Sequence, residues 1–313
     1  MNKIEFGDCR ETMRRWKEQG IKAQTCVTSP PYFGLRDYGH EGQIGLEETP
    51  EEYIKAMVDV FRCVWDVLED DGTLWLNIGD SYNGSGGQGT KPNIMSKEAA
   101  EGRGGKAIKV DGIKPKDLIG IPWMLAFALR ADGWYLRQDI IWHKPNPMPE
   151  SVTDRCTKAH EYIFLMSKSS KYYYDSKSIA EPHKDISLQR WSNGGEDTNN
   201  TKYDKKNPQT SVGNLRNGSN PLREEGANKR SVWTVTTKPY AGAHFAVFPS
   251  DLIEPCILAG APAGGIVLDP FMGSGTTAQV AQNLGRQYIG CELNPAYMEL
   301  QNIRTAQQSL VLE

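Results

Sequence analysis

Residues 28–32 read TSPPY, and they follow an apolar segment that has the character of a buried strand. Adjacent prolines hold φ near one value, donate no hydrogen bonds and push the preceding residues into extended conformations. The segment therefore predicts a stiff corner with carbonyl groups in fixed directions. Ser29 places a hydroxyl before this corner and Tyr32 places an aromatic ring after it. Such groups can accept hydrogen bonds from a planar ligand and stack on it; a rigid loop after an edge strand is the alternative.

A second candidate segment lies near the C-terminus, where residues 265–278 read GIVLDPFMGSGTTA. It has the pattern of a short apolar strand followed by a glycine turn, and residues 278–284 can form the helix after it. Residues 286–292 then give another strand, which ends in the acid Glu292. Glycines allow a backbone to approach a ligand at a helix N-terminus, and an acid after the next strand can bind ribose hydroxyls. The pattern predicts a nucleotide-like cofactor and leaves its identity open.

The same turn matches the dinucleotide fingerprint G-x-G-x-x-A, so an NAD-dependent oxidoreductase is the alternative interpretation. Asp269, Pro270 and Phe271, however, stand between the strand and the first glycine. They lengthen the turn and place a carboxylate where a pyrophosphate would come close. A carboxylate there favours a cationic or zwitterionic ligand with an amino-acid moiety. A plain strand-to-helix turn would need neither two glycines nor two acids.

The segments that must position these residues alternate between helical and strand patterns. Such alternation predicts an α/β fold, with a doubly wound, mostly parallel sheet and helices on both faces. The clearest helix begins with a capping box of Thr49 and Glu52. Gly72 is expected to end this helix before a buried strand over residues 73–80. Further helices are expected over residues 118–130 and from Asp251, and further strands over 134–142 and 160–166.

Composition excludes several classes of protein. With 313 residues and 38% hydrophobic residues, the chain is long enough for one large domain, with or without a sizeable insertion. Its six cysteines include no CxxC pair, which argues against a zinc site or a disulfide framework, so no metal is expected. The N-terminus has no apolar signal segment, and no apolar stretch is long enough to span a bilayer. These features predict a soluble, cytoplasmic protein.

One region departs from the alternating pattern. Residues 176–240 contain few aliphatic side chains and are expected to be an insertion between two halves of the domain, residues 1–175 and 241–313. Residues 151–240 hold 15 Lys and Arg against 10 Asp and Glu, a charge of +5, so the rest of the chain must carry −8 to reach the total of −3. This separation fits a region that faces a polyanion, although a solvated polar insertion would look similar.

In this order, TSPPY and DPFMGSGTT resemble the amino-methylating DNA methyltransferases of the β arrangement. In that family a catalytic motif, (S/D/N)-P-P-(Y/F/W), precedes the DNA-recognition region, and the F-x-G-x-G cofactor turn comes last. The resemblance extends from Asp8 to Leu300, with residues 176–240 unmatched. It implies a Rossmann-like methyltransferase fold, S-adenosylmethionine as the methyl donor and double-stranded DNA as the substrate. Residues 176–240 would then be the target-recognition region.

The resemblance gives the rigid corner a chemical role. The exocyclic amino group of cytosine or adenine is a poor nucleophile, because its lone pair is delocalised into the ring. The carbonyl of Pro30 and the hydroxyl of Ser29 are expected to accept hydrogen bonds from this amino group and turn its lone pair towards the methyl group. Tyr32 is expected to stack on a base flipped out of the helix. The implied catalytic residues are Ser29, Pro30, Pro31 and Tyr32.

The resemblance also implies a set of cofactor-binding residues. Asp8 resembles the acid on the adenine side of the cofactor, with an exposed turn residue as the alternative. Residues 244–250 resemble the segment that closes over the methionine end, although Ser250 can equally be a helix N-cap. Residues 139–146 and 157–161 resemble segments that shape the target-base pocket. The implied cofactor residues are Asp8, Phe245, Ser250, Asp269, Phe271, Gly273, Ser274, Gly275, Thr276 and Glu292.

The methylated base stays open at this point. Serine at the first motif position is commonest in relatives that act on cytosine N4, and aspartate points to adenine N6, so Ser29 favours cytosine. Pro255-Cys256 resembles the nucleophilic pair of the cytosine C5 enzymes, but Cys256 lies in an apolar helical pattern and is expected to be a core residue. A cognate restriction endonuclease is a candidate partner, and either a monomer or a homodimer fits the sequence.

Overall fold

The computed structural model describes residues 1–35, 39–40, 42–84, 109–183, 226–237 and 248–306. The chain separates into two compact units, one of Met1–Asp175 with Ser231–Glu313 and one of Ser176–Arg230. In the second unit the backbone amides of Glu181 and Ala227 each donate to the carbonyl oxygen of the other residue, both at 2.8 Å. Most of the insertion expected over residues 176–240 lies outside the described residues.

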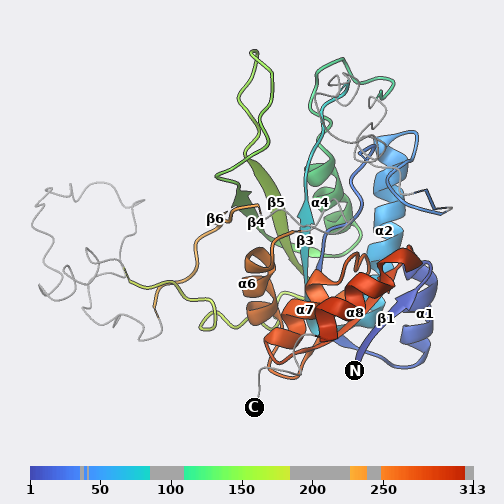
Figure 1. Cartoon of the computed structure of the whole chain (residues 1–313), viewed down its shortest axis with the longest axis vertical. Coiled ribbons are helices and arrows are strands. Elements are labelled where there is room, and N and C mark those ends of the chain that lie inside the picture. Colours follow the sequence, from blue (N-terminus) through green and yellow to red (C-terminus); the bar gives the residue numbers. More distant parts are fainter. Residues whose placement is uncertain (36–38, 41, 85–108, 184–225, 238–247, 307–313) are drawn as a thin grey trace, which may run out of the picture. The chain divides into compact units, whose positions relative to one another are not determined.

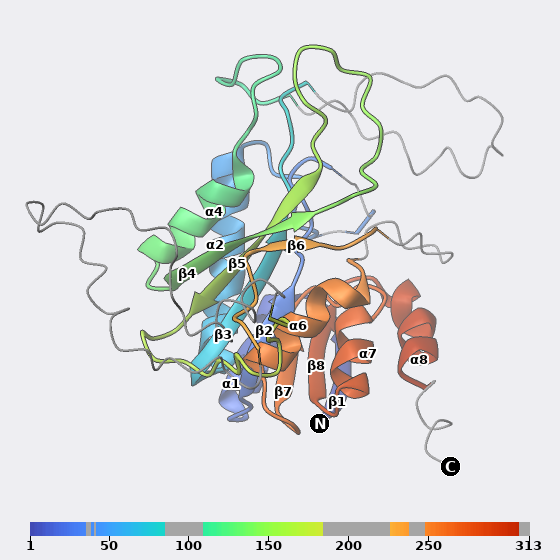
Figure 2. The ribbon, with the colours of Figure 1, turned by 90° about the vertical axis from the view of Figure 1, so that its left-hand side faces the viewer.

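The described strands of the first unit are β1 (Asn2–Phe6), β2 (Ala23–Thr28), β3 (Leu68–Ile78), β4 (Tyr135–His143), β5 (His160–Ser167), β6 (Val232–Thr234), β7 (Ile266–Asp269) and β8 (Gln287–Glu292). They form one sheet in the order β1-β8-β7-β2-β3-β5-β4-β6 (Figure 1, with β2, β7 and β8 labelled in Figure 2). The first five strands in this order, from β1 through β8, β7 and β2 to β3, pair in parallel with their neighbours. At the other edge, β6 pairs in parallel with β4. In contrast, β5 runs antiparallel to both of its neighbours, β3 and β4. The expected doubly wound, mostly parallel α/β sheet is confirmed.

The described helices are α1 (Cys9–Glu18), α2 (Pro50–Val67), α4 (Ile121–Ala131), α6 (Ser250–Gly260), α7 (Thr276–Asn283) and α8 (Met298–Ala306). They cover both faces of the sheet: α1, α2 and α4 lie on one face, and α6 and α7 lie on the other, with α8 against α7 (Figure 2). Among the helices of the described ranges, none is both long and apolar enough to cross a membrane.

The capping box predicted for α2 is confirmed. The Thr49 hydroxyl accepts from the Glu52 amide and the Glu52 carboxylate accepts from the Thr49 amide, both at 3.2 Å. The predicted helix end is wrong, because α2 ends at Val67 and Gly72 lies inside β3. A Cβ on Gly72 would stand 2.9 Å from the carbonyl oxygen of Glu69 in its own strand and 3.1 Å from that of Gln24 in β2. Here glycine permits a close approach between neighbouring strands rather than ending a helix.

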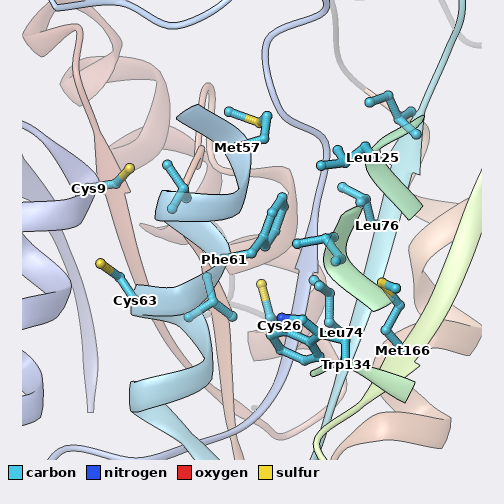
Figure 3. Packing of buried hydrophobic residues seen from close by; sticks show 14 of the residues in the cluster. Cys9, Cys26, Met57, Phe61, Cys63, Leu74, Leu76, Leu125, Trp134 and Met166 are labelled. Carbon is cyan, nitrogen blue, oxygen red and sulfur yellow. The ribbon is translucent and has the colours of Figure 1, made fainter. Parts of the chain in front are cut away.

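A buried hydrophobic cluster holds α2 and α4 against the sheet (Figure 3). Phe61 of α2, Leu74 of β3 and Leu125 of α4 are all fully buried within it. Close packing of this kind fixes the positions of the strands, and with them the segments that leave the strand ends. On the other face, Cys256 of α6 is 1% exposed, which confirms that it is a core residue.

Candidate active site

A cavity of about 500 Å³ lies at the carboxyl ends of the parallel strands. The crevice at this edge of a doubly wound sheet is where ligands generally bind. All four expected catalytic residues line the cavity: Ser29, Pro30, Pro31 and Tyr32. Of the expected cofactor residues, those that line it are Asp8, Phe271, Gly273 and Glu292. The two sequence motifs therefore share one cavity.

The other expected cofactor residues lie elsewhere. Four belong to the turn between β7 and α7 or to its flanks without lining the cavity: Asp269, Ser274, Gly275 and Thr276. Ser250 is the first residue of α6, whose N-cap is Pro249, so the alternative interpretation of Ser250 as the N-cap is wrong. The Ser250 hydroxyl instead donates to the Asp251 carboxylate at 3.1 Å. Phe245 falls outside the described residues.

Asp269 connects the two motifs directly. Its Oδ1 accepts from the Thr28 hydroxyl at 2.6 Å and from the Phe271 amide at 3.0 Å. Its Oδ2 accepts from the Thr277 hydroxyl at 2.7 Å. Burial raises the pKa of the Asp269 carboxyl to about 6, although these hydrogen bonds oppose the rise. The acid therefore fixes the glycine turn against the TSPPY corner from beneath the cavity.

The TSPPY corner is fixed from the side of α2 by Tyr53. This tyrosine is fully buried, and its hydroxyl donates to the carbonyl oxygen of Pro31 at 2.8 Å. The Pro31 carbonyl is thus already hydrogen-bonded, whereas no hydrogen bond between described residues uses the carbonyl of Pro30. Helical spacing places Tyr53 on the buried face of α2, but such periodicity does not reveal where its hydroxyl ends.

Tyr32 points into a polar cluster on the opposite side of the corner. Its hydroxyl donates to Oε2 of Glu161 at 2.8 Å, and Glu161 also forms an ion pair with Lys144. Burial, together with the charge of Glu161, raises the pKa of the Tyr32 hydroxyl well above its ordinary value, so this hydroxyl stays protonated. The segments 139–146 and 157–161, expected at the target-base pocket, supply Trp142, Lys144, Asn146 and Glu161 to the cavity wall.

The glycine turn is organised around Glu292, at the end of β8. Oε2 of Glu292 accepts from the Gly273 amide at 2.7 Å, and Oε1 accepts from the Asn294 amide at 2.8 Å. Burial raises the pKa of this carboxyl. Gly275 has a φ of 88°, a left-handed conformation that favours glycine. The turn therefore holds its backbone close to a carboxylate that faces the cavity.

Asp8 lines the cavity from the end of β1, so it is more than an exposed turn residue. It is the N-cap of α1, and its Oδ1 accepts from the Arg10 amide at 2.7 Å. The Arg10 guanidinium also forms a hydrogen-bonded ion pair with this carboxylate, which keeps the pKa of Asp8 below its ordinary value. Asp8 is thus an ionised acceptor held at one wall.

Some cavity residues carried no signal in the sequence. His40 and Tyr297 line the cavity from segments without a recognisable pattern, and Asn77 lines it from the expected strand over residues 73–80, whose pattern does not mark a site residue. Within the described part of the chain, no three His, Cys, Asp or Glu side chains gather as metal ligands would. The groups available are hydrogen-bond acceptors, aromatic rings and a glycine turn, which suit a nucleotide-like ligand beside a planar one.

The chain matches a family model and has relatives of high identity. The model described as DNA methylase, for the N6/N4 methyltransferases, matches residues 23–303. Type II methyltransferase M.SmaI of Serratia marcescens is 50% identical over 301 residues, which cover 95% of this chain and 88% of the relative. Type II methyltransferase M.Cfr9I of Citrobacter freundii is 46% identical over 294 residues, which cover 94% of this chain and 84% of the relative.

Solved structures share the fold. The Thermus thermophilus protein TTHA0409, in complex with S-adenosyl-L-methionine, has a TM-score of 0.60 at 21% identity, with 100% of this chain and 96% of that chain covered. The cytosine-N4-specific PvuII DNA methyltransferase has a TM-score of 0.61 at 16% identity, with 97% of this chain and 86% of that chain covered. At these identities the structures support the fold alone. The match to the family model and the identity to the relatives show that this chain belongs to the N6/N4 family of DNA methylases.

Proposed function

We propose that this protein is a site-specific DNA methyltransferase that moves a methyl group from S-adenosylmethionine to the exocyclic N4 amino group of cytosine in double-stranded DNA. The observation that carries the proposal is the shared cavity, in which the TSPPY corner and the glycine turn lie against each other through the contact of Thr28 with Asp269. One ligand at the turn and a second ligand at the corner would therefore be held next to each other.

The residues of the turn fit S-adenosylmethionine. Glu292 and Asp8 offer carboxylate oxygens to hydroxyl and amino groups, Phe271 offers an aromatic face, and Gly273 lets the backbone come close. When bound, this cofactor supplies an electrophilic methyl group on a sulfonium centre. Asp269 supports the turn from below, together with the three residues around the helix start, Ser274, Gly275 and Thr276. The contributions of Phe245 and Ser250 stay predictions from the sequence.

The residues of the corner fit an exocyclic amino group. The Ser29 hydroxyl and the Pro30 carbonyl accept its two N–H hydrogen bonds, and the neighbouring Pro31 carbonyl already accepts one from Tyr53. These bonds turn the amino lone pair towards the turn side of the cavity. Tyr32 stacks on the extruded base. No covalent bond to the protein is needed, so the rate gain comes from orientation and electrostatics.

The choice of cytosine rests on Ser29. A neutral hydroxyl is a weaker acceptor than the aspartate found at this position in adenine-modifying relatives. Adenine N6 is the alternative, with the same residues in the same roles. A more distant alternative, an NAD-dependent oxidoreductase, is disfavoured by membership in a DNA methylase family. The names of the relatives, type II methyltransferases, favour a restriction-modification system with a cognate endonuclease as partner.

The test is base-resolved sequencing of DNA from cells that express this protein, beside cells that express the Ser29→Ala variant. N4-methylcytosine at one recurring sequence, absent with the variant, supports the proposal. N6-methyladenine at such a sequence would mean that the methylated base is adenine and not cytosine. If no modified base appears and calorimetry detects binding of NAD but none of S-adenosylmethionine, the methyltransferase proposal is wrong.

A further inference from the structure

We propose that Glu161 and Lys144 form a brace that fixes the ring of Tyr32 in the orientation needed to stack on the extruded base. The inference deepens the proposed function and rests on it. Glu161 and Lys144 are therefore positioning residues, which act on the reaction through Tyr32.

The first contact of the brace is the hydrogen bond from Tyr32. The Tyr32 hydroxyl donates to Oε2 of Glu161 at 2.8 Å, so one end of the ring is tied to a carboxylate. A hydrogen bond to a charged acceptor is stronger than one between neutral groups. The ring of a tyrosine turns about two side-chain bonds. Anchoring the hydroxyl oxygen, which lies on the axis of the second bond, restricts the first rotation, whereas the second rotation is limited by what packs beside the ring.

The second contact holds the carboxylate itself. Glu161 is ion-paired with Lys144, and the side chains are only 16% and 18% exposed, respectively. At this burial, removing one partner leaves an uncompensated charge with little water around it. The Lys144 ammonium also lies 4.3 Å from the centre of the Trp142 ring, which gives it a cation–π contact. Glu161 therefore cannot move away from Lys144 without leaving a buried charge unpaired.

The third contact comes from β3. The side-chain amide of Asn77 donates to Oε2 of Glu161 at 3.4 Å and to the Tyr162 carbonyl at 3.1 Å. The brace thus draws on β3, β4 and β5, because Asn77 is in β3, Lys144 directly follows β4 and Glu161 is in β5. Three strands of a rigid sheet support a side chain that itself belongs to a loop.

The space beside the ring is equally restricted. A Cβ added to Gly79 would stand 2.8 Å from Cε2 of Tyr32 and 3.3 Å from Cδ of Glu161. Only a residue without a side chain fits at this place, so the ring lies directly against the backbone at the end of β3. With its hydroxyl tied and this side filled, Tyr32 is ordered before any base arrives. Preorganisation of this kind lowers the entropic cost of binding.

The experiment measures kcat and KM for methylation, cofactor affinity by calorimetry and the order of the Tyr32 ring by NMR of protein with labelled tyrosine. The variants are Tyr32→Phe, Glu161→Gln, the double variant, Gly79→Ala and a charge-neutral Lys144→Met/Glu161→Gln pair. We expect each single variant to lower kcat about tenfold while the cofactor Kd stays within about twofold. The Tyr32→Phe/Glu161→Gln double variant should lose no more than either single variant, because the two residues act as one unit.

A matched control is Asp132→Asn, which removes an ion pair with Arg62 at a similar side-chain exposure of 15% for the acid, away from the cavity. It should leave kcat unchanged. The brace is wrong if the two effects multiply in the double variant, or if Glu161→Gln leaves the Tyr32 ring as ordered as in the wild type. Absence of methylation by the wild type would refute the proposed function instead. The ring measurement on the free protein would still decide whether Glu161 holds Tyr32.

Discussion

The hydroxyl of Thr28 donates to the carboxylate of Asp269 at 2.6 Å, although 241 positions separate the two residues in the chain. Thr28 is the last residue of β2 and precedes Ser29, and Asp269 is the last residue of β7 and precedes the glycine turn. The two strands are neighbours in the sheet. The pairing of β2 with β7 and this buried hydrogen bond together set the distance between the corner that would hold a base and the turn that would hold the methyl donor.

The first prediction concerns the pH dependence of stability. The pKa of Asp269 rises from 3.8 to about 6 on folding, so between these values the folded protein binds more protons than the unfolded chain. The stabilisation from this group is fully present below about pH 4 and is lost as the pH rises through about 6. Asp269→Asn keeps the shape and does not titrate. Its free energy of unfolding in urea, relative to the wild type, should rise by about 3 kcal/mol between about pH 4 and 7, at about 1.4 kcal/mol per pKa unit.

The exposed acid Asp59 provides a control, because Asp59→Asn removes a carboxylate that is not buried. This variant controls for the general effect of removing one carboxylate on the free energy of unfolding. A difference between Asp269→Asn and the wild type that stays constant with pH would show that Asp269 has an ordinary pKa in the folded protein.

The second prediction concerns the TSPPY corner. Ser29→Ala and Tyr32→Ala should each lower methyl transfer by about 100-fold or more, because each removes a group that orients the reacting amine. Both variants should fold, with unchanged circular dichroism, and should bind S-adenosylmethionine as the wild type does. Full activity in either variant would refute the role assigned to that residue.

The third prediction separates direct from indirect contributions to cofactor binding. Glu292→Ala should weaken S-adenosylmethionine binding about tenfold to 100-fold in calorimetry, since a hydrogen bond to a charged group contributes about 1.5–3 kcal/mol. Asp269→Ala should weaken it as well, but by loosening the turn, and should also lower the thermal midpoint. An unchanged Kd in Glu292→Ala would remove this residue from the cofactor site.

The fourth prediction concerns the hydroxyl of Tyr53. Tyr53→Phe keeps the buried ring and leaves the Pro31 carbonyl without its partner, which should lower the free energy of unfolding by about 1–3 kcal/mol. It should also lower kcat, because the corner is then free to shift. Urea unfolding and single-turnover kinetics measure the two effects, and loss of stability with an unaltered rate would mean that Tyr53 supports the fold alone.

The fifth prediction tests the insertion as the region that reads DNA. Excision of residues 190–228 should harm DNA recognition more than cofactor affinity. Since Ala227 pairs with Glu181, a shorter excision of residues 190–222 leaves that backbone contact in place and is the better variant. We expect its DNA affinity to fall at least about tenfold with the cofactor Kd within about twofold. Unchanged sequence selectivity would contradict the role of the insertion.

Local signals in the sequence predicted the parts of the fold that depend on neighbouring residues. The capping box of Thr49 and Glu52, and the strand–turn–helix around Gly273, are visible because their partners lie within a few positions. The prediction at Gly72 was wrong for the same reason. A glycine after a helical pattern predicts a helix end, whereas here Gly72 lies in β3, close to the carbonyl oxygen of Gln24 on another strand.

The site was predicted as a list of residues, and its geometry was not. Asp269 carried the signal of an acid near a ligand, but Thr28 and Thr277 satisfy both of its oxygens. Glu161 lies in a segment expected at the target-base pocket, but its hydrogen bond to Tyr32 is a long-range contact that the motifs did not predict. The same holds for the hydrogen bond of Tyr53 to Pro31. Motif spacing indicates which groups a reaction needs. The residues that hold those groups in place depend on which strands pair, and sequence periodicity does not encode strand pairing.

The reversed direction of β5 has a consequence for how specificity can evolve. A strand that runs against its neighbours begins at the edge where the others end, so Glu161 and the hairpin before it reach the cavity beside the TSPPY corner, away from the glycine turn. Under the proposed function, substitutions in that hairpin would reshape the wall that faces the nucleobase, while β7 and β8 would hold the methyl donor unchanged. The hairpin before β5 can thus vary in sequence while β7 and β8 stay unchanged.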